Sequence, residues 1–227
     1  MIEDLKFEFS FKTNINDSFR TQSLIGQYDL ENKETIQSFK GNYKLPEKWN
    51  IGLIVGNSGS GKTSIAKNVF GDFISVPWSD KPIIENFDPK LSMDKITYAL
   101  GSVGFNCVPY WLKPFSVLSN GEKSRVELAR MALEMDLVVY DEFTSLVDRD
   151  VAKSMSNSVK KLFKNLDKQL VAVTCHHDIR DWLQPDWVYD TDKKEFSLPK
   201  PQGAKSSSLT LSELQIKNGT FISNITI

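Results

Sequence analysis

The stretch Ile51-Gly-Leu-Ile-Val-Gly56-Asn-Ser-Gly-Ser-Gly-Lys62-Thr63 decides the fold of this chain. Residues 51–55 form an apolar run, which is typical of a strand buried inside a parallel sheet. Residues 56–63 fit the pattern G-x-x-x-x-G-K-[ST] at every fixed position, and residues 62–70 predict a helix. A strand, a glycine-rich loop and a helix in this order are the context that a phosphate-binding loop requires, so we predict that residues 56–63 bind phosphate groups.

The residue types of this loop explain how it would bind phosphate. Glycine lets the backbone curl so that several N–H groups point inward, and the N-terminus of the next helix adds a partial positive charge. Lys62 can place its cation against the β- and γ-phosphates, and the Thr63 hydroxyl is a hard oxygen ligand for Mg²⁺. The alternative is a loop that only happens to precede a helix, which the complete motif disfavours. We therefore predict nucleotide contacts from Gly56, Asn57, Ser58, Gly59, Ser60, Gly61, Lys62, Thr63 and Ser64.

A second motif places two acids at the end of an apolar strand, Leu137-Val-Val-Tyr-Asp141-Glu142. Asp141 is predicted to hold the Mg²⁺ shell together with Thr63. Glu142 is predicted to orient and polarise a water that attacks the γ-phosphate in line, a reaction that depends on positioning and charge neutralisation. Two solvated acids leaving a strand would be the simpler interpretation, and the neighbouring phosphate-binding loop argues against it.

A third motif, Leu118-Ser-Asn-Gly-Glu122, precedes a helix predicted over 120–134. On its own it is a capping box, in which Ser119 and Glu122 satisfy the first N–H groups of that helix. The order of a phosphate-binding loop, L-S-x-G-E, a strand ending in Asp-Glu and a strand followed by histidine resembles the ABC-type ATPases. Residues 118–122 resemble their signature motif, with Asn120 replacing its first glycine and Glu122 its glutamine. This form is more similar to soluble chromosome-maintenance members than to transporters.

The resemblance covers about residues 1–198 and implies a shared active site. Two subunits would stack head to tail, with each ATP between the phosphate-binding loop of one and the signature motif of the other. Ser145-Leu-Val-Asp148 is similar to the family's D-loop, and His176 or His177 to its switch histidine; His176 is preferred because it directly follows the strand, although His177-Asp178 also fits the family's usual pair. A purely structural histidine is the alternative. The implied catalytic residues are Glu142, His176 and Lys62, and the implied ATP contacts beyond the loop are Ser119, Asn120, Gly121, Glu122 and Asp148.

The remaining pattern predicts an α/β fold: a P-loop NTPase with a mainly parallel central sheet, an N-terminal antiparallel β subdomain and a shortened helical subdomain. In the first fifty residues, Phe7, Phe9 and Phe11 alternate along a strand, and another short strand is expected at 36–39. Further strands are predicted at 73–76, 137–140 and 170–174, helices at 93–100, 151–166 and 179–183, and a hairpin from 187–190 and 195–198.

We predict three parts of the chain: an ATPase domain over 1–198, a linker over 199–208, and a β-prone segment over 209–227 that is either an extension or the start of a truncated second domain. The segments 141–149 and 175–187 resemble small ATPases carried by phages and other mobile elements. Some of those are fused to an acetyltransferase-like domain.

The sequence also departs from the family pattern. No glutamine lies between Thr63 and Leu118, so the family's Q-loop residue is missing, and Asp80 and Glu85 are the only substitutes we suggest. The same stretch is shorter than in transporters, where it docks on membrane helices, which argues against a transporter subunit. The aromatic residue that stacks on adenine in the family has three candidates that are equally suited to the core: Phe39, Tyr43 and Trp49.

Composition gives no indication of a nucleic-acid or membrane partner. Of 227 residues, 28 are basic and 29 acidic, which leaves a formal net charge of −1. Lys160, Lys161, Lys164 and Lys168 are interpreted as a solvated helix face. We see neither a signal peptide nor a membrane-spanning run, so a cytoplasmic location is expected. Cys107 and Cys175 match no metal spacing and are predicted to be buried thiols.

The leading hypothesis is a soluble ABC-type ATPase that dimerises on MgATP and acts on a protein partner or DNA. A nucleotide-binding subunit of a transporter is the first alternative, and an ATP-gated interaction module with little turnover is the second. A small-molecule kinase would share the phosphate-binding loop but would leave residues 118–122 and the acid pair unexplained.

Overall fold

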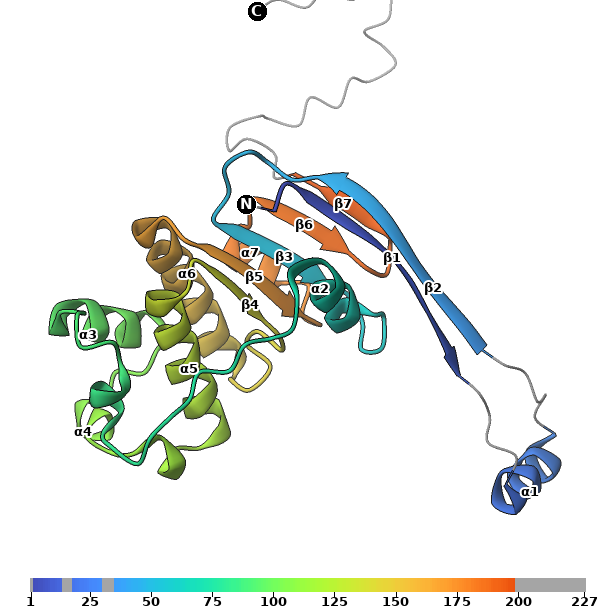
Figure 1. Ribbon diagram of the computed structural model, residues 1–227, viewed down its shortest axis with the longest axis horizontal. Coiled ribbons are helices and arrows are strands. Elements are labelled where there is room, and N and C mark those ends of the chain that lie inside the picture. The colour runs from blue at the N-terminus through green and yellow to red at the C-terminus, as the bar shows by residue number, and fades with distance from the viewer. Residues whose placement is uncertain (1, 14–17, 30–34, 199–227) are drawn as a thin grey trace, which may run out of the picture.

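The computed structural model describes residues 2–13, 18–29 and 35–198 (Figure 1). Its centre is a five-stranded sheet with the order β4-β5-β3-β6-β7. These strands are β4 (Leu137–Tyr140), β5 (Gln169–Thr174), β3 (Ile51–Val55), β6 (Trp187–Asp190) and β7 (Glu195–Ser197). The first four are parallel, and only β7 runs antiparallel to its neighbour. The predicted α/β fold with a mainly parallel sheet is therefore confirmed.

The two faces of the sheet are covered by different elements, because residues of a strand alternate between its faces. Leu53 of β3 packs in the core formed with α5 (Asn120–Glu134), α6 (Arg149–Leu166) and α7 (Ile179–Leu183). Ile54, the next residue, packs in a second core with α2 (Lys62–Phe70) and the N-terminal strand. Every residue of β3 is buried, as its apolar sequence predicts. The phosphate-binding loop thus starts from the middle of a rigid sheet.

An antiparallel ribbon precedes the sheet, formed by β1 (Asp4–Thr13) and β2 (Thr35–Lys44) with α1 (Phe19–Tyr28) between them in sequence. Figure 1 shows the ribbon running past the sheet, with α1 beyond its far end. The predicted alternation along β1 is confirmed by the rings of Phe9 and Phe11, whose centroids lie 5.5 Å apart. The strand predicted at 36–39 is too short, and α1 was not predicted. Ser18 caps α1 by accepting the N–H of Thr21 at 3.3 Å.

A helical region connects α2 to α5. It contains the 3₁₀ helices η1 (Ile83–Asn86) and η2 (Phe115–Val117) and the α-helices α3 (Met93–Ser102) and α4 (Val108–Trp111). The strand predicted at 73–76 is wrong, because this segment makes no ladder. Ser75 is instead held by its side chain, which donates to Glu127 Oε1 at 2.8 Å, and Ile74 is 61% exposed.

Several predicted boundaries agree with the structure. The helices 62–70, 120–134 and 179–183 and the strand 137–140 have the observed limits. Both cysteines are free thiols, but Cys107 is exposed and Cys175 only partly buried, so the prediction of burial is wrong. Cys107 lies at the start of α4, at the end of a loop. The predicted segments 199–208 and 209–227 lie outside the described residues. Within the described ranges, none of the helices has the length and apolar character needed to cross a bilayer.

Candidate functional site

The phosphate-binding loop needs glycine at Gly61 for two separate reasons. Gly61 has φ 87°, in the left-handed region that glycine adopts at low cost, and it directly precedes α2. A Cβ atom there would lie 2.2 Å from the ring of Phe39, so the β2 strand presses an aromatic side chain against the loop. Gly59 also has a positive φ, of 78°. The loop therefore has the curled backbone that the motif predicts.

Lys62 is already directed across this loop. It is only 7% exposed, and its Nζ donates a hydrogen bond of 2.6 Å to the carbonyl oxygen of Asn57. A buried ammonium is favourable only where acceptors or anions surround it. The ammonium of Lys62 is therefore placed so that phosphate oxygens could accept its remaining hydrogen bonds.

The two predicted metal ligands meet in the structure. Thr63 Oγ1 donates to Asp141 Oδ2 at 2.8 Å, although the two residues are 78 positions apart in sequence. They meet because Asp141 follows β4 and Thr63 lies in the first turn of α2, which follows β3 in the same sheet. A hydroxyl and a carboxylate are the hard oxygen donors that Mg²⁺ prefers, so this pair fits a magnesium ion held between protein and phosphate.

Glu142 is held in an unusual backbone conformation next to this pair. Its φ is 54°, and Thr144 also has a positive φ, of 67°. Left-handed non-glycine residues cost on the order of 1–3 kcal/mol and concentrate at functional sites. The Ser145 hydroxyl donates to Glu142 Oε2 at 2.5 Å, and the N–H of Phe143 donates to Val173 O at 2.9 Å. The turn is therefore anchored to β5, and the carboxylate of Glu142 is oriented by Ser145.

The signature-like motif forms the predicted capping box. The Ser119 hydroxyl accepts the N–H of Glu122 at 3.4 Å, and Glu122 Oε2 accepts the N–H of Ser119 at 2.9 Å. The backbone N–H and the hydroxyl of Ser119 both donate to Glu122 Oε2, and these two hydrogen bonds hold the pKa of Glu122 below its usual value. The side chain of Glu122, predicted as a nucleotide contact, is thus engaged in its own helix cap.

Gly121 brings the signature-like motif against the D-loop-like segment 145–148. A Cβ atom on Gly121 would lie 2.9 Å from the carbonyl oxygen of Leu146, so only glycine allows this approach. Asp148, at the end of that segment, accepts the N–H of Val151 at 2.9 Å and caps α6. The structure therefore gives Asp148 a role in helix capping besides its predicted contact with nucleotide.

We expect Asp148→Ala to lower the free energy of unfolding by about 1 kcal/mol, because α6 loses its N-cap acceptor. In a domain of this size such a loss lowers the melting temperature by about 2–4 °C, measurable by circular dichroism without nucleotide. Asp148→Asn is the matched control, since asparagine is an equally good N-cap. Equal losses in both variants would contradict the capping role.

The two histidines after β5 have different surroundings. The backbone N–H of His176 donates to Thr174 Oγ1 at 3.2 Å. The imidazole of His177 lies beside the turn after β6, with Nε2 3.6 Å from Asp192 Oδ2 and Nδ1 3.9 Å from Asp190 Oδ2. His177 thus lies near two carboxylates, and the choice of His176 as the switch histidine stays a prediction.

A contact that the sequence did not indicate joins the phosphate-binding loop to the turn after β6. The N–H of Asn57 donates to both carboxylate oxygens of Asp192, at 2.9 and 3.1 Å. Ser60 Oγ and Thr191 Oγ1 lie 2.5 Å apart. In the sequence, residues 190–194 indicate only a hairpin turn, and no local motif predicts that this turn reaches the loop.

The three candidates for stacking on adenine lie in different parts of the structure. Trp49 is a core residue, 3% exposed and packed edge-on against Trp187. Tyr43 stacks on Phe196, with ring centroids 5.3 Å apart. Phe39 lies beside the phosphate-binding loop and lines a cavity of about 300 Å³ that also includes Ser60. Phe39 is therefore the candidate that the structure brings to the loop.

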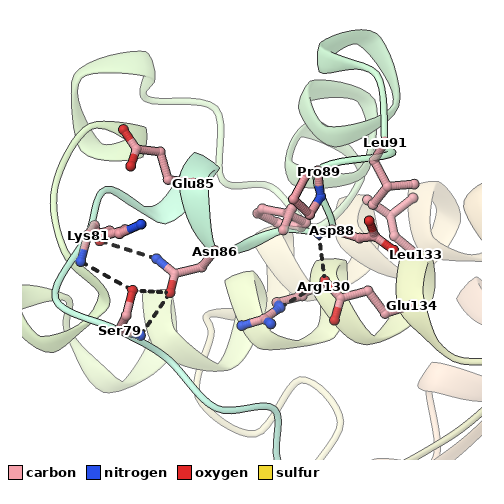
Figure 2. Close-up of a pocket in the computed structure, with 11 residues that line it drawn as sticks. Ser79, Lys81, Glu85, Asn86, Asp88, Pro89, Leu91, Arg130, Leu133 and Glu134 are labelled. Atoms are coloured by element: carbon pink, nitrogen blue, oxygen red, sulfur yellow. Dashed lines mark hydrogen bonds and ion pairs between the residues drawn. The ribbon is translucent and has the colours of Figure 1, made fainter.

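Glu85, one suggested substitute for the missing glutamine, lies in a cavity of about 670 Å³ between the η1 region and α5 (Figure 2). Arg130 Nε donates to Glu134 Oε1 at 2.9 Å on one wall, and Asn86 Nδ2 donates to Lys81 O at 3.2 Å on another. No contact of Asp80 or Glu85 with Thr63 or Asp141 is found among the described residues.

Two of the four lysines considered for nucleic-acid binding are engaged in contacts within the protein. Lys160 Nζ donates to Gln184 Oε1, and Lys168, just after the helix, donates to Leu133 O, both at 2.5 Å. Burial lowers the pKa of both side chains. Lys160 and Lys168 are therefore less solvated than predicted, whereas Lys161 and Lys164 are exposed, as expected for a solvated helix face.

Comparison with known proteins identifies relatives among transporter ATPases. The energy-coupling factor transporter ATP-binding protein EcfA1 of Leuconostoc mesenteroides is 24% identical over 179 residues, which cover 60% of this chain and 64% of that protein. The thiamine import ATP-binding protein ThiQ of Jannaschia sp. is 28% identical over 192 residues, covering 65% and 82%. The chain thus spans just under two thirds of the length of EcfA1. No protein-family model matches the chain.

Solved structures share the fold. A dimeric bacterial ABC transporter cassette aligns with a TM-score of 0.50 at 14% identity, covering 80% of this chain and 94% of the cassette. An archaeal ribosome recycling factor, solved with a ribosomal stalk protein, aligns with a TM-score of 0.53 at 19% identity, covering 68% of this chain and 34% of that one. The fold is that of a P-loop NTPase. Within that class, the fold is similar to that of ABC ATPase domains, and the relatives EcfA1 and ThiQ are ATP-binding proteins of transport systems.

Proposed function

We propose that this chain binds MgATP and hydrolyses it as an ABC-type ATPase. The observation that carries the proposal is the 2.8 Å hydrogen bond between Thr63 Oγ1 and Asp141 Oδ2, which joins the phosphate-binding loop to the acidic end of β4. These oxygens are of the kind that Mg²⁺ binds beside a nucleoside triphosphate. Glu142 follows directly and supplies the carboxylate that a water nucleophile needs.

The chemistry follows from the positions of these residues. The loop N–H groups and Lys62 bind the phosphates and hold the γ-phosphorus in place. Glu142 orients a water and accepts its proton while the water oxygen attacks the γ-phosphorus and the bond to the β–γ bridging oxygen breaks, which yields ADP and phosphate. Bound Mg²⁺ supplies neutralisation of the phosphate charge. Positioning and electrostatics, rather than covalent chemistry, carry the reaction.

We further propose that two copies assemble head to tail, with ATP between the phosphate-binding loop of one and residues 119–121 of the other. The N-terminus of α5 supports this proposal, because the first N–H groups of a helix and its partial positive charge favour an anion. Gly121 packs against the carbonyl oxygen of Leu146, which places the D-loop-like segment beside this helix end. His176 would then complete the site beside the γ-phosphate.

The partner that best fits the comparisons is a component of a membrane transporter. The relatives EcfA1 and ThiQ are ATP-binding proteins of transport systems, which favours this reading over a DNA-associated ATPase. A membrane partner, which the short helical region argued against, is therefore the proposed one. The cavity beside Arg130 offers a polar recess on the helical region for such a partner (Figure 2). The narrower resemblance to phage ATPases stays a prediction.

Phosphate release at increasing protein concentration tests the shared active site. We expect the rate per subunit to rise with concentration, because a site completed by a second copy is active only in the dimer. Sedimentation with and without MgATP should show a matching shift from monomer to dimer. A rate per subunit that stays constant while the protein stays monomeric would rule out the head-to-tail arrangement.

Membrane fractionation tests the transporter partner. The tagged chain should be expressed in the cells that naturally produce it. We expect it to sediment with membranes and to be extracted by detergent as a complex with an integral membrane protein. Lys81→Glu, which reverses a charge at the cavity in Figure 2, should weaken this association without changing ATP binding. Recovery of the chain entirely outside the membrane fraction would favour the partner-protein alternative.

A further inference from the structure

The turn after β6 packs directly against the phosphate-binding loop. Thr191 donates its N–H to Val55 O at 2.8 Å, and its hydroxyl lies 2.5 Å from Ser60 Oγ. A Cβ atom on Gly56 would lie 2.0 Å from that hydroxyl, so the turn and the loop are in close contact. Asp192 then binds the N–H of Asn57 with both carboxylate oxygens. Two consecutive residues of the turn therefore hold the loop at two points.

The side chain of Asp192 is not needed to shape the turn itself. Asp190 does that, because its Oδ1 accepts the N–H groups of Asp192 and Lys193, both at 3.1 Å. Asp190 is also the more buried of these two acids, with only 7% of the residue exposed. The carboxylate of Asp192 is left to reach the loop. Its side chain lies beside a loop proposed to bind phosphate, so the hydrogen bonds that it accepts from Asn57, rather than the shape of the turn, account for an acid at this position.

The imidazole of His177 is the second group that lies near the Asp192 carboxylate. Its Nε2 lies 3.6 Å from Asp192 Oδ2, and its Nδ1 lies 3.9 Å from Asp190 Oδ2. His177 adjoins His176 in the chain, so the Asp192 carboxylate lies within ion-pair distance of the segment that carries His176. The chain of contacts runs from Asn57 through Asp192 to His177.

We propose that Asp192 is a positioning residue of the ATP site: it fixes the phosphate-binding loop through Asn57 and couples that loop, through His177, to the segment carrying His176. The inference rests on the proposed ATPase function and adds a residue that the ABC motifs in this sequence do not include. Asp192 thereby links the phosphate-binding loop to the segment that carries His176. A shift of the loop on nucleotide binding would then move that segment.

Two substitutions separate the two contacts of Asp192. Asp192→Ala removes both, and we expect ATP affinity, measured by calorimetry with MgATP, to fall about tenfold, as for the loss of one charge-assisted hydrogen bond. Asp192→Asn keeps an oxygen acceptor for the N–H of Asn57 but loses the charge facing His177. It should restore ATP affinity to within about threefold of the natural chain while turnover at saturating ATP stays several-fold lower.

A double-mutant cycle tests the coupling directly. His177→Asn should lower turnover with little change in KM, and the Asp192→Asn/His177→Asn double variant should be no slower than either single variant. Glu195→Gln, an exposed acid on the adjoining strand β7, is the matched control and should behave like the natural chain. Thermal unfolding of each variant reports whether folding is intact; if Asp192→Ala does not fold, Asp192→Asn and the cycle carry the test.

The outcomes distinguish the inference from the proposed function. If the natural chain binds no ATP, both fail. If the natural chain binds and hydrolyses ATP and Asp192→Ala matches it in affinity and turnover, only the role of Asp192 fails. Losses that simply add in the double variant would overturn the coupling between Asp192 and His177.

Discussion

Glu142→Gln should reduce steady-state phosphate release by at least about 100-fold, the contribution typical of a positioned general base, while ATP binding is retained. The amide keeps the shape of the side chain and still accepts the Ser145 hydroxyl, but it cannot take a proton from water. Because ATP then stays intact, the head-to-tail dimer should accumulate. Phosphate release and sedimentation velocity with MgATP measure the two effects on the same sample.

The control for this variant is Glu127→Gln. Glu127 is a partly buried acid of α5 that accepts the Ser75 hydroxyl in the helical region, away from the phosphate-binding loop, so its loss of charge should leave hydrolysis unchanged. If Glu142→Gln hydrolyses ATP at the rate of the natural chain, Glu142 does not activate the water. A variant that is inactive but remains monomeric with ATP would instead argue against the shared site.

Lys62→Ala should weaken ATP binding by about 100-fold or more, since it removes a desolvated cation that faces the phosphates. The low exposure of Lys62, 7%, makes this loss larger than that expected for a surface lysine. Calorimetric titration with MgATP measures the affinity, and the weakened binding should be accompanied by loss of ATP-dependent dimerisation.

Lys67→Ala is the matched control for Lys62. It lies on the same helix, α2, but its ammonium is on the surface, 3.8 Å from Asp72 Oδ1 and over the ring of Phe73. Exposed pairs of this kind contribute little, so ATP affinity should not change. Equal weakening in both variants would point to loss of the helix rather than to a phosphate contact, and unchanged affinity in Lys62→Ala would contradict the proposed site.

The candidate site was predictable where its residues act through local motifs. The limits of α2 and α5 follow from a glycine loop and a capping box, which are local signals. The meeting of Thr63 with Asp141 follows from the sheet, because parallel strands bring their carboxyl ends to one edge. Such a contact can be predicted once the parallel sheet is expected, and the alternation of strands and helices in the sequence indicates that sheet.

Other parts depend on long-range contacts that leave no local pattern. Residues 73–76 have the composition of a strand, yet Ser75 is bound by Glu127 of α5 and no strand pairs with the segment. Helix α1 has no buried residue, so no apolar periodicity could indicate it. Asp192 reaches Asn57 across 135 positions of sequence. In each case the partner, rather than the segment itself, determines the outcome.

The pairing of β1 with β2 restricts how the length of this protein can vary. Phe9 lies opposite Phe39 and Phe7 opposite Gly41, where a Cβ atom would lie 2.5 Å from the Phe7 ring. One residue inserted into a strand turns the side chains on one side of the insertion to the opposite face, and such an insertion in β2 beside Phe39 would turn that ring away from Gly61. Natural insertions and deletions within the ribbon should therefore come in twos on both strands, whereas the connection through α1 can gain or lose single residues without disturbing the loop.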